Sequence, residues 1–358
     1  LEENREILSR YRLKGFSYLG GLLVETGNAI ELKGVTKRFG DVIANDNVNL
    51  TVRKGEILSI LGENGSGKTT LMNMLSGIYF PDEGEIYVDG KEVTIRSPKD
   101  SFALGIGMIH QHFKLINILT AAENIILGLP GKEKLNMKQV EKEIRELTEQ
   151  YGFDLNPSQK IYDMSVSQKQ TVEIVKVLYR GADILILDEP TAVLTPQETE
   201  KLFAVLRNMR KAGKSIIIIT HKLNEVLELS DRVAVLRKGK YIDTVETAKA
   251  TVESLTEMMV GEKVKLDINR TEPVGAEKRI EMRGITCKNK EGLKVLTEAS
   301  FTAYSGEILG VAGISGSGQK ELLESVAGLQ PIESGEILYF SPEGTTEKIS
   351  EMKAEDIK

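Results

Sequence analysis

At 358 residues the chain is longer than one hydrophobic core usually organises, so its length predicts two or more domains. It contains 41% hydrophobic and 28% charged residues, and its net charge of −6 argues against a protein whose main task is to grip nucleic acid. The single cysteine, Cys287, excludes an internal disulfide framework and fits a reducing compartment. No apolar stretch approaches the ~20 residues that a membrane-spanning helix needs, so we do not expect this chain to cross a membrane by itself.

The two ends of the chain suggest that it is a fragment. It lacks an initiator methionine, and it stops at Lys358 in a polar stretch without a closing element. We interpret residues 1–28 as an N-terminal extension, which is either upstream sequence or a poorly ordered, disordered segment.

The first chemical motif is GENGSGKTT at residues 62–70, which fits the pattern G-x-x-x-x-G-K-[ST]. The run ILSIL before it predicts a buried strand, and LMNMLSGI after it has helical spacing. Glycines let the backbone amides point at phosphate oxygens, and the helix N-terminus adds its positive dipole end. Lys68 is expected to reach the β- and γ-phosphates of a nucleotide, and Thr69 to offer a hydroxyl to Mg²⁺. The predicted nucleotide-binding loop is Gly62, Glu63, Asn64, Gly65, Ser66, Gly67, Lys68, Thr69 and Thr70. A glycine-rich turn without a ligand is the structural alternative.

Two segments between this loop and the next motif have mainly structural interpretations. His110 and His112 form an H-x-H pair, but no nearby cysteine or third ligand supports a metal site. In VEKEIRELTEQYGF, apolar residues recur at helical spacing, which predicts the packed face of a helix. These residues are Val140, Ile144, Leu147 and Tyr151.

The segment ADILILDEPTAVL, residues 182–194, predicts a buried strand that ends in two carboxylates. Asp188 suits the coordination sphere of Mg²⁺, and Glu189 suits a general base for an attacking water. An acidic strand end that caps the next turn is the alternative. The segment SIIIITH, residues 215–221, predicts a second buried strand that brings His221 to the same edge. His221 is either a residue that orients water or the γ-phosphate, or a structural histidine.

The chain also repeats itself at an interval of 250 or 251 residues. IELKGVTKRFG at 30–40 matches IEMRGITCKNK at 280–290, and the block at 54–77 around the loop matches 305–328. We therefore predict a first domain over 29–260 and a second over 279–358, cut off after its first third. Residues 261–278 are charged and contain Pro273, which is typical of a linker.

Four stretches together resemble one family: the loop GENGSGKTT, MIHQHFKL (108–115), MSVSQKQTVEIVKVLYRGADILILDEP (164–190) and ITHKLNEV (219–226). They resemble the ATP-binding-cassette (ABC) ATPases, specifically the tandem-cassette subunits of bacterial sugar and nucleoside importers. The resemblance implies an α/β P-loop NTPase cassette with a RecA-like core, an antiparallel β subdomain and a helical subdomain at about 96–172. The start of a second, degenerate cassette follows it.

The resemblance also implies roles for single residues. Phe39 would stack on adenine, unless it is simply a core aromatic. Gln111 would sense Mg²⁺ and couple to a membrane subunit, and His221 would be the switch histidine. The signature, which would grip a second ATP across the domain interface, would be Ser165, Val166, Ser167 and Gln168. Implied metal-site residues are Thr69, Gln111 and Asp188, and implied catalytic residues are Glu189, His221 and Gln111.

The second copy of the loop departs from the pattern. Gln319 stands in the place of Lys68 and Lys320 in the place of Thr69, and Asn289 falls at or near the place of Phe39. Neutral glutamine cannot neutralise phosphate, and a lysine beside Mg²⁺ would repel the metal. The signature of copy one is altered too, since MSVSQ replaces the usual L-S-G-G-Q. We therefore expect one live and one degenerate nucleotide site, and a chain that binds MgATP but hydrolyses it weakly alone.

These implications predict the ATP-hydrolysing subunit of an importer for simple sugars or nucleosides. It would sit peripherally on the cytoplasmic face of integral-membrane permease subunits, with a periplasmic or extracellular solute-binding protein as an indirect partner and no nucleic acid. Residues 112–125 would contact the permease, with an ordinary surface loop as the alternative. A soluble tandem cassette that acts on ribosomes is the alternative function, but it would need a long basic linker. The transported solute is not encoded here.

Overall fold

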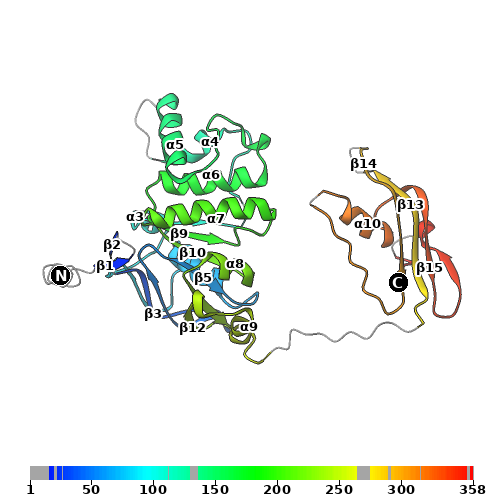
Figure 1. The fold of residues 1–358 in the computed structure, drawn as a ribbon, viewed down its shortest axis with the longest axis horizontal. Helices are drawn as coiled ribbons and strands as arrows, with labels where there is room; N and C mark the ends of the chain where they lie inside the picture. The colour runs from blue at the N-terminus through cyan, green and yellow to red at the C-terminus, as the bar shows by residue number, and fades with distance from the viewer. Residues whose placement is uncertain are drawn as a thin grey trace. The chain divides into compact units, whose positions relative to one another are not determined.

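The chain folds into two units, residues Leu1–Lys265 and Leu266–Lys358. A computed structural model (Figure 1) describes residues 16–19, 22–25, 27–111, 113–129, 136–263, 275–288, 292–314, 316–352 and 355–357. His112, Asn289, and most of the predicted extension and linker therefore lie outside the described residues. Within the extension, β1 (Phe16–Leu19) and β2 (Leu22–Glu25) pair as an antiparallel hairpin.

The first unit is built on a ten-stranded sheet in the order β7-β6-β3-β4-β12-β11-β5-β10-β9-β8, counted over the described residues. Its strands are β3 (Asn28–Phe39), β4 (Val42–Arg53), β5 (Ile57–Leu61), β6 (Glu83–Val88), β7 (Lys91–Val93), β8 (Ile106–Ile109), β9 (Ile184–Asp188), β10 (Ser215–Thr220), β11 (Arg232–Arg237) and β12 (Lys240–Glu246). The three predicted buried strands are ILSIL, the strand before Glu189 and the strand before His221, and they are β5, β9 and β10.

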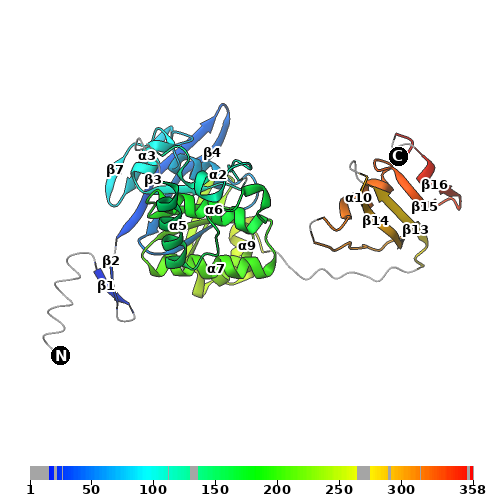
Figure 2. The same ribbon diagram turned by 90° about the horizontal axis from the view of Figure 1, so that it is seen from above.

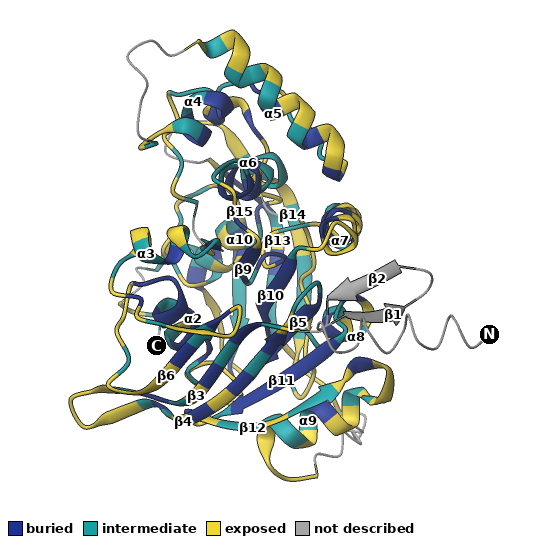
Figure 3. Cartoon of the chain, turned by 90° about the vertical axis from the view of Figure 1, so that its left-hand side faces the viewer, coloured by how far each residue is buried: buried dark blue, intermediate teal, exposed yellow. Residues whose placement is uncertain are grey.

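The core of this sheet is parallel. β5 pairs in parallel with both β10 and β11, and β9 pairs in parallel with β10 and β8. Every residue of β5, β9 and β10 is buried, and Figure 3 shows these strands mostly in dark blue. Continuous apolar runs are what a strand covered on both faces requires. In contrast, β3, β4, β6 and β7 pair antiparallel, and one parallel pair between Lys240 and Asp46 joins the two parts.

Helices cover the sheet and form a separate bundle at one end. The helices are α2 (Lys68–Leu75), α3 (Pro98–Ala103), α4 (Ala121–Ile126), α5 (Met137–Tyr151), α6 (Val166–Tyr179), α7 (Pro196–Lys211), α8 (Leu223–Leu229) and α9 (Val252–Val260). Figure 1 shows α4, α5 and α6 gathered beyond α7, and they share an apolar core that includes Ile125, Ile144 and Val175. The predicted helix around Ile144 is therefore α5, and its buried residues include Ile144 and Tyr151. The described residues have the predicted α/β class, with a parallel core, an antiparallel part and a helical bundle.

The second unit repeats the first part of this plan. Its sheet has the order β14-β13-β15-β16, and Figure 2 shows α10 beside β14. Its elements are β13 (Lys278–Lys288), β14 (Lys294–Tyr304), α10 (Gln319–Val326), β15 (Ile332–Phe340) and β16 (Thr346–Lys348). The segment 307–314, which aligns with β5, forms no strand. Ile308 is 78% exposed, whereas the aligned Ile57 is fully buried between two neighbouring strands.

Candidate functional site

The predicted phosphate loop lies between β5 and α2, as the sequence indicated. Gly65 and Gly67 have φ of 80° and 93°, in the left-handed region that favours glycine. Gly67 is the residue that caps α2, so the helix begins at Lys68 and its N-terminal amides face the loop. A helix N-terminus with free amides is a natural site for a phosphate group.

The backbones of β11 and β4 lie against the loop at two of its glycines. A Cβ on Gly62 would lie 2.3 Å from the carbonyl oxygen of Leu236, at the end of β11. A Cβ on Gly67 would lie 2.3 Å from the carbonyl oxygen of Ala44 in β4. Contacts this short cannot accept a side chain without movement of the backbone. The curvature of the loop is therefore fixed by its neighbours as well as by its own sequence.

Hydrogen bonds hold the loop from the same side. Asn45 is fully buried, and its Nδ2 donates to the Gly67 carbonyl oxygen at 3.2 Å. In the turn between β11 and β12, the Gly239 amide donates to the Ser66 carbonyl oxygen at 3.2 Å. The sequence analysis missed both residues, since they lie far from the loop along the chain. Asn45 lies near the start of β4, where most of its neighbours are polar or exposed, so no local pattern in the sequence singles it out.

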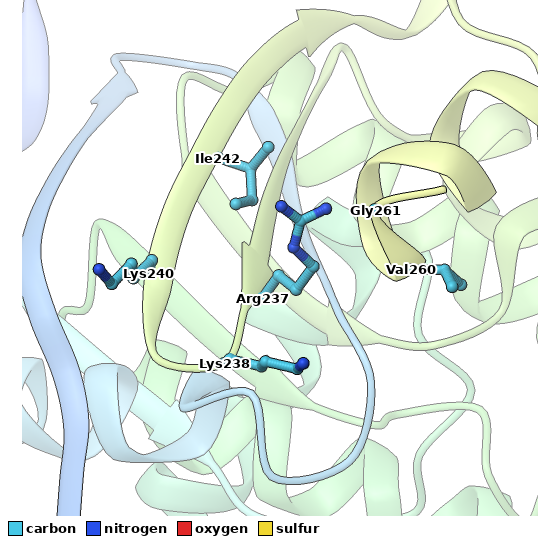
Figure 4. A pocket seen from close by; sticks show the side chains of 6 residues that line it. All are labelled: Arg237, Lys238, Lys240, Ile242, Val260 and Gly261. Carbon is cyan, nitrogen blue, oxygen red and sulfur yellow. The ribbon is translucent and has the colours of Figure 1, made fainter. Parts of the chain in front are cut away.

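A pocket of about 370 Å³ lies beside this turn and is lined mainly by cations (Figure 4). Its lining residues are Arg237, Lys238, Lys240, Ile242, Val260 and Gly261. Figure 4 shows Arg237 reaching toward the end of α9, where its Nη1 donates to the Met258 carbonyl oxygen at 3.3 Å. Lys240 pairs with Asp46. Arg237 therefore bonds a helix end and Lys240 forms an ion pair, and none of the residues that line the pocket belongs to the phosphate loop.

Lys68 is buried in the phosphate loop, with 6% of its surface exposed. Its Nζ donates to the carbonyl oxygens of Gly62 and Glu63 at 2.7 and 2.9 Å. Burial lowers the pKa of the Lys68 ammonium, and the Glu189 and Asp188 carboxylates act in the opposite direction. The hydroxyl of Ser66 is buried and has no hydrogen-bond partner among the described residues. An anion at the loop would supply a partner to both groups.

Asp188 ends β9 and lies against the start of α2. Burial, followed by the charge of Glu189, raises the pKa of Asp188, while a hydrogen bond with Thr69 and the charge of Lys68 lower it. The predicted magnesium residues Thr69 and Asp188 are thus brought together from positions far apart in the chain. A divalent cation beside Asp188 would favour the ionised carboxylate that burial disfavours.

Glu189 lies at the centre of the predicted catalytic residues. Its Oε2 accepts a hydrogen bond from Gln111 Nε2 at 3.2 Å, and its Oε1 lies 2.9 Å from His221 Nδ1. Gln111 follows β8, Glu189 follows β9 and His221 follows β10, and these are adjacent parallel strands. Because the carboxyl ends of parallel strands meet at one edge of the sheet, three distant residues form one cluster.

The remaining predicted site residues are placed as follows. Phe39 ends β3 and is 43% exposed, which rules out the core interpretation, and the centroid of its ring lies 5.1 Å from that of Tyr79.

Ser165 caps α6: its hydroxyl accepts a hydrogen bond from the Gln168 amide, while Gln168 Oε1 accepts one from the Ser165 amide. Within the described residues, no hydrogen bond joins this signature to the phosphate loop. Burial, followed by the charge of Lys114, lowers the pKa of His110, and no cluster of three metal-ligating side chains occurs in the described ranges.

Comparison with known proteins decides the family. The profile of the ABC transporter family matches residues 45–192, a stretch that contains the loop, Gln111 and the acid pair. The chain is 48% identical to the nucleoside import ATP-binding protein NupA of Lactococcus lactis subsp. cremoris, over 89% of this chain and 63% of that protein. It is 46% identical to the guanosine import ATP-binding protein NupO of Bacillus subtilis, over 86% of this chain and 61% of that protein. The first unit is an ATP-binding cassette of the ABC transporter family.

Solved structures agree with this family assignment. The cassette is similar to the ADP conformation of MJ1267, an ATP-binding cassette of an ABC transporter, with a TM-score of 0.57 and 27% identity. That match covers 66% of this chain and 96% of the solved chain. The predicted resemblance is thus confirmed for the family and the fold. The chain spans 61–63% of the length of the two import proteins, so their full activity is a matter for proposal.

In the second unit, the turn at Gly318 and the start of α10 repeat the geometry found at Gly67 and α2, with different chemistry. Gly318 has φ of 88° and precedes α10, as Gly67 precedes α2. Gln319 begins α10, and its Nε2 donates to the Val311 carbonyl oxygen at 3.2 Å. The neutral amide thus bonds a backbone carbonyl just before the loop, whereas Lys68 bonds the carbonyls of Gly62 and Glu63 and carries a charge.

The close contacts of the loop generate a stability prediction. Gly67→Ala should lower the free energy of unfolding of the cassette by about 2–4 kcal/mol, because a left-handed alanine costs ~1–2 kcal/mol and its Cβ also meets the Ala44 carbonyl. Gly90→Ala is the matched control, since Gly90 has φ of 75° and no atom within 4 Å of its Cβ position. Urea denaturation followed by circular dichroism measures both. Equal losses in the two variants would show that the neighbouring backbone does not clamp the loop.

Proposed function

We propose that the first cassette binds MgATP and hydrolyses its terminal phosphate. The single observation that carries this proposal is the position of Glu189, whose carboxylate lies between Gln111 and His221 at the strand edge next to an intact phosphate loop. Lys68 supplies the positive charge, and the Ser66 hydroxyl and the loop amides supply further donors. Together, the ammonium, the hydroxyl and the loop amides suit a triphosphate better than a single small anion, because these donors extend over a whole turn of helix.

The residues present fit a magnesium ion bound with the nucleotide. Thr69, Asp188 and Gln111 offer a hydroxyl, a carboxylate and an amide oxygen, which are ligand types that Mg²⁺ accepts directly or through water. When bound, Mg²⁺ would neutralise charge on the β- and γ-phosphates. Phe39 is exposed at the end of β3, and adenine would stack on its ring.

Glu189 is the proposed general base. A water held beside its carboxylate attacks the γ-phosphorus, so that a new P–O bond forms while the bond to the ADP oxygen breaks. The proton of that water passes to Glu189. His221 holds Glu189 by its Nδ1, which leaves Nε2 free to contact the γ-phosphate or the water. Gln111 holds the other carboxylate oxygen and thereby fixes the direction of the base.

We further propose that the protein is the ATPase subunit of an importer for sugars or nucleosides. Relatives that are 40–48% identical are named as nucleoside, guanosine, glucose and ribose import ATP-binding proteins. No helix in the described part of the chain is long and apolar enough to cross a membrane. The proposal therefore requires separate permease subunits, which the cassette would meet from the cytoplasmic face through residues 112–125, and a solute-binding protein outside. The ribosome-acting alternative is not favoured by any of these relatives.

The second unit, under this proposal, belongs to a second cassette with a degenerate nucleotide site. The exposed apolar residues of the segment 307–314 and the charge lost at Gln319 support this interpretation. The live site, built on Lys68 and Glu189, would then receive its partner signature from that second cassette. Residues 261–278 would link the two domains, 29–260 and 279–358.

Replacing the loop cation tests nucleotide binding. Lys68→Gln, which copies the residue of the second loop, should weaken MgATP binding by tenfold or more, because each charge-assisted hydrogen bond to phosphate is worth about 1.5–3 kcal/mol. Lys138→Gln on exposed α5 makes the same charge change away from the loop and should leave the affinity unchanged. Isothermal titration calorimetry gives both values. No MgATP binding by the unmodified chain at millimolar ligand would overturn the proposed function.

Removing the proposed base separates binding from chemistry. Glu189→Gln keeps the size of the side chain and a hydrogen-bonding oxygen but cannot take a proton. We expect MgATP affinity close to that of the unmodified protein and a loss of hydrolysis of about 100-fold or more in the assembled transporter. Phosphate release, measured together with nucleotide binding, tests this. Unchanged turnover would remove Glu189 from the role of base.

The arrangement of sites also predicts the behaviour of the isolated chain. It should bind MgATP with one strong site and turn it over only weakly, because the signature that completes the live site is not supplied by MSVSQ of the same cassette. Addition of the intact partner cassette should raise the rate. Turnover by the monomeric 358-residue chain at the rate of the assembled transporter would contradict this arrangement.

A further inference from the structure

The backbone at Glu189 is strained. Its φ is 47°, in the left-handed region that non-glycine residues rarely adopt. Such a residue costs of order 1–3 kcal/mol and persists only where its surroundings over-determine it. Because β9 ends here, the strand ladder fixes only the N-terminal side of Glu189. The residues that follow must therefore be held by something else.

Three consecutive residues are each held by a different element. The Glu189 amide donates to the Ile219 carbonyl oxygen in β10 at 2.9 Å. Pro190 accepts a hydrogen bond at its carbonyl oxygen from buried Gln170 Nε2 of α6, at 2.7 Å. The Thr191 carbonyl oxygen accepts from Lys222 Nζ, just before α8, at 2.9 Å. Glu189 is thus the first of three residues that are hydrogen-bonded to β10, to α6 and to the residue just before α8.

The third fastening is part of a closed polar cluster. Thr191 is 2% exposed, and its hydroxyl donates to Glu225 Oε2 at 2.5 Å. Lys222 Nζ also donates to Glu225 Oε1 at 2.9 Å and lies 3.2 Å from Thr191 Oγ1. One ammonium, one carboxylate and one hydroxyl therefore satisfy each other around a single backbone carbonyl. Thr191 is buried and the side chains of Lys222 and Glu225 are partly exposed, at 38% and 19%; a polar network with its partners satisfied in this way rigidifies the segments it joins.

Two residues of the cluster lie close in sequence to Glu189 and His221. Lys222 directly follows His221, and Thr191 follows Glu189 by two residues. A bond between Lys222 and Thr191 therefore fixes the distance between the two loops that carry the pair. A capping role for α8 alone does not account for the cluster, since the Lys222 side chain does not cap the backbone of the helix and the Thr191 hydroxyl comes from another loop.

We propose that Thr191, Lys222 and Glu225 are positioning residues that hold the strained Glu189 against His221. They act by keeping the 2.9 Å contact between the Glu189 carboxylate and His221 Nδ1. This inference rests on the proposed function for its chemical meaning. The contact itself can be tested without added nucleotide.

Removing one hydroxyl tests the cluster. Thr191→Val keeps the shape of the side chain but leaves Glu225 without its donor, whereas Thr191→Ser retains the hydroxyl. Nitrogen-15 NMR of labelled histidine reports the hydrogen bond at Nδ1, and the chain has only three histidines, so His221→Gln assigns the signal. At a pH of about 8, where an ordinary imidazole is neutral, we expect Thr191→Val to move the His221 Nδ1 signal toward that of free histidine. Thr191→Ser should restore it.

The controls separate positioning from folding. Thr199→Val makes the same chemical change on α7, and we expect no movement of the His221 signal there. Glu225→Gln removes the charge and keeps an acceptor, and it should give an intermediate shift even if Thr191→Val folds poorly. Calorimetry with MgATP should give the unmodified affinity within about threefold for Thr191→Val, because the phosphate loop is untouched. ATP turnover should fall about 10- to 100-fold, the cost of misplacing a catalytic group by about 1 Å.

The outcomes distinguish this inference from the proposed function. An unmoved His221 signal in folded Thr191→Val and Glu225→Gln would overturn the positioning role, whatever the nucleotide does. A moved signal with normal MgATP binding and lower turnover supports it. If the unmodified chain bound no MgATP, the proposed function would fail while the NMR comparison still decided whether the cluster holds the contact.

Discussion

The phosphate loop keeps its shape because the backbones of β4 and β11 press against it at the two points where glycine has no side chain. The carbonyl oxygens of Ala44 and Leu236 occupy the space in which a Cβ at Gly67 or Gly62 would lie. This contact fixes where α2 begins, and so where Lys68 and Thr69 stand. The position of Thr69 in turn decides that Asp188 has a hydroxyl partner. The candidate site is therefore a consequence of how a loop fits between two strands.

Burial of charged groups shifts the pKa values of the site. Burial lowers the pKa of Lys68 and raises that of Asp188, so in both groups it disfavours the charged form. The two groups partly compensate each other, and the charge of Glu189 acts on both. A ligand that carries both negative phosphate and a divalent cation would favour the charged form of each group. The strained backbone at Glu189 is a further local cost that the surrounding hydrogen bonds offset.

The two units show that the same sequence pattern forms a strand only where neighbouring strands are present to pair with it. The run before the second loop has apolar residues in the places where β5 has them, yet it forms no strand, and Ile308 is exposed. In the first unit, β10 and β11 flank β5 and supply its hydrogen bonds. A parallel strand cannot exist alone, because its amides and carbonyls need hydrogen-bond partners on a neighbouring strand. The local turn and helix around Gly318 and Gln319 need no such partners, and they form.

The sequence alone determined the elements and the chemistry they carry. The apolar runs ending at Leu61 and Asp188, the glycines of the loop and the spacing around Ile144 each specify local structure, because strand, turn and helix have different periods and different backbone angles. The tertiary structure decided which of these distant residues lie in contact. Only the parallel order β8-β9-β10 brings Gln111 and His221 to Glu189, only packing makes Asn45 a support of the loop, and only the position of α8 lets Lys222 and Glu225 hold Thr191. Contacts between residues far apart in the chain depend on strand order and helix packing, and no local pattern encodes them.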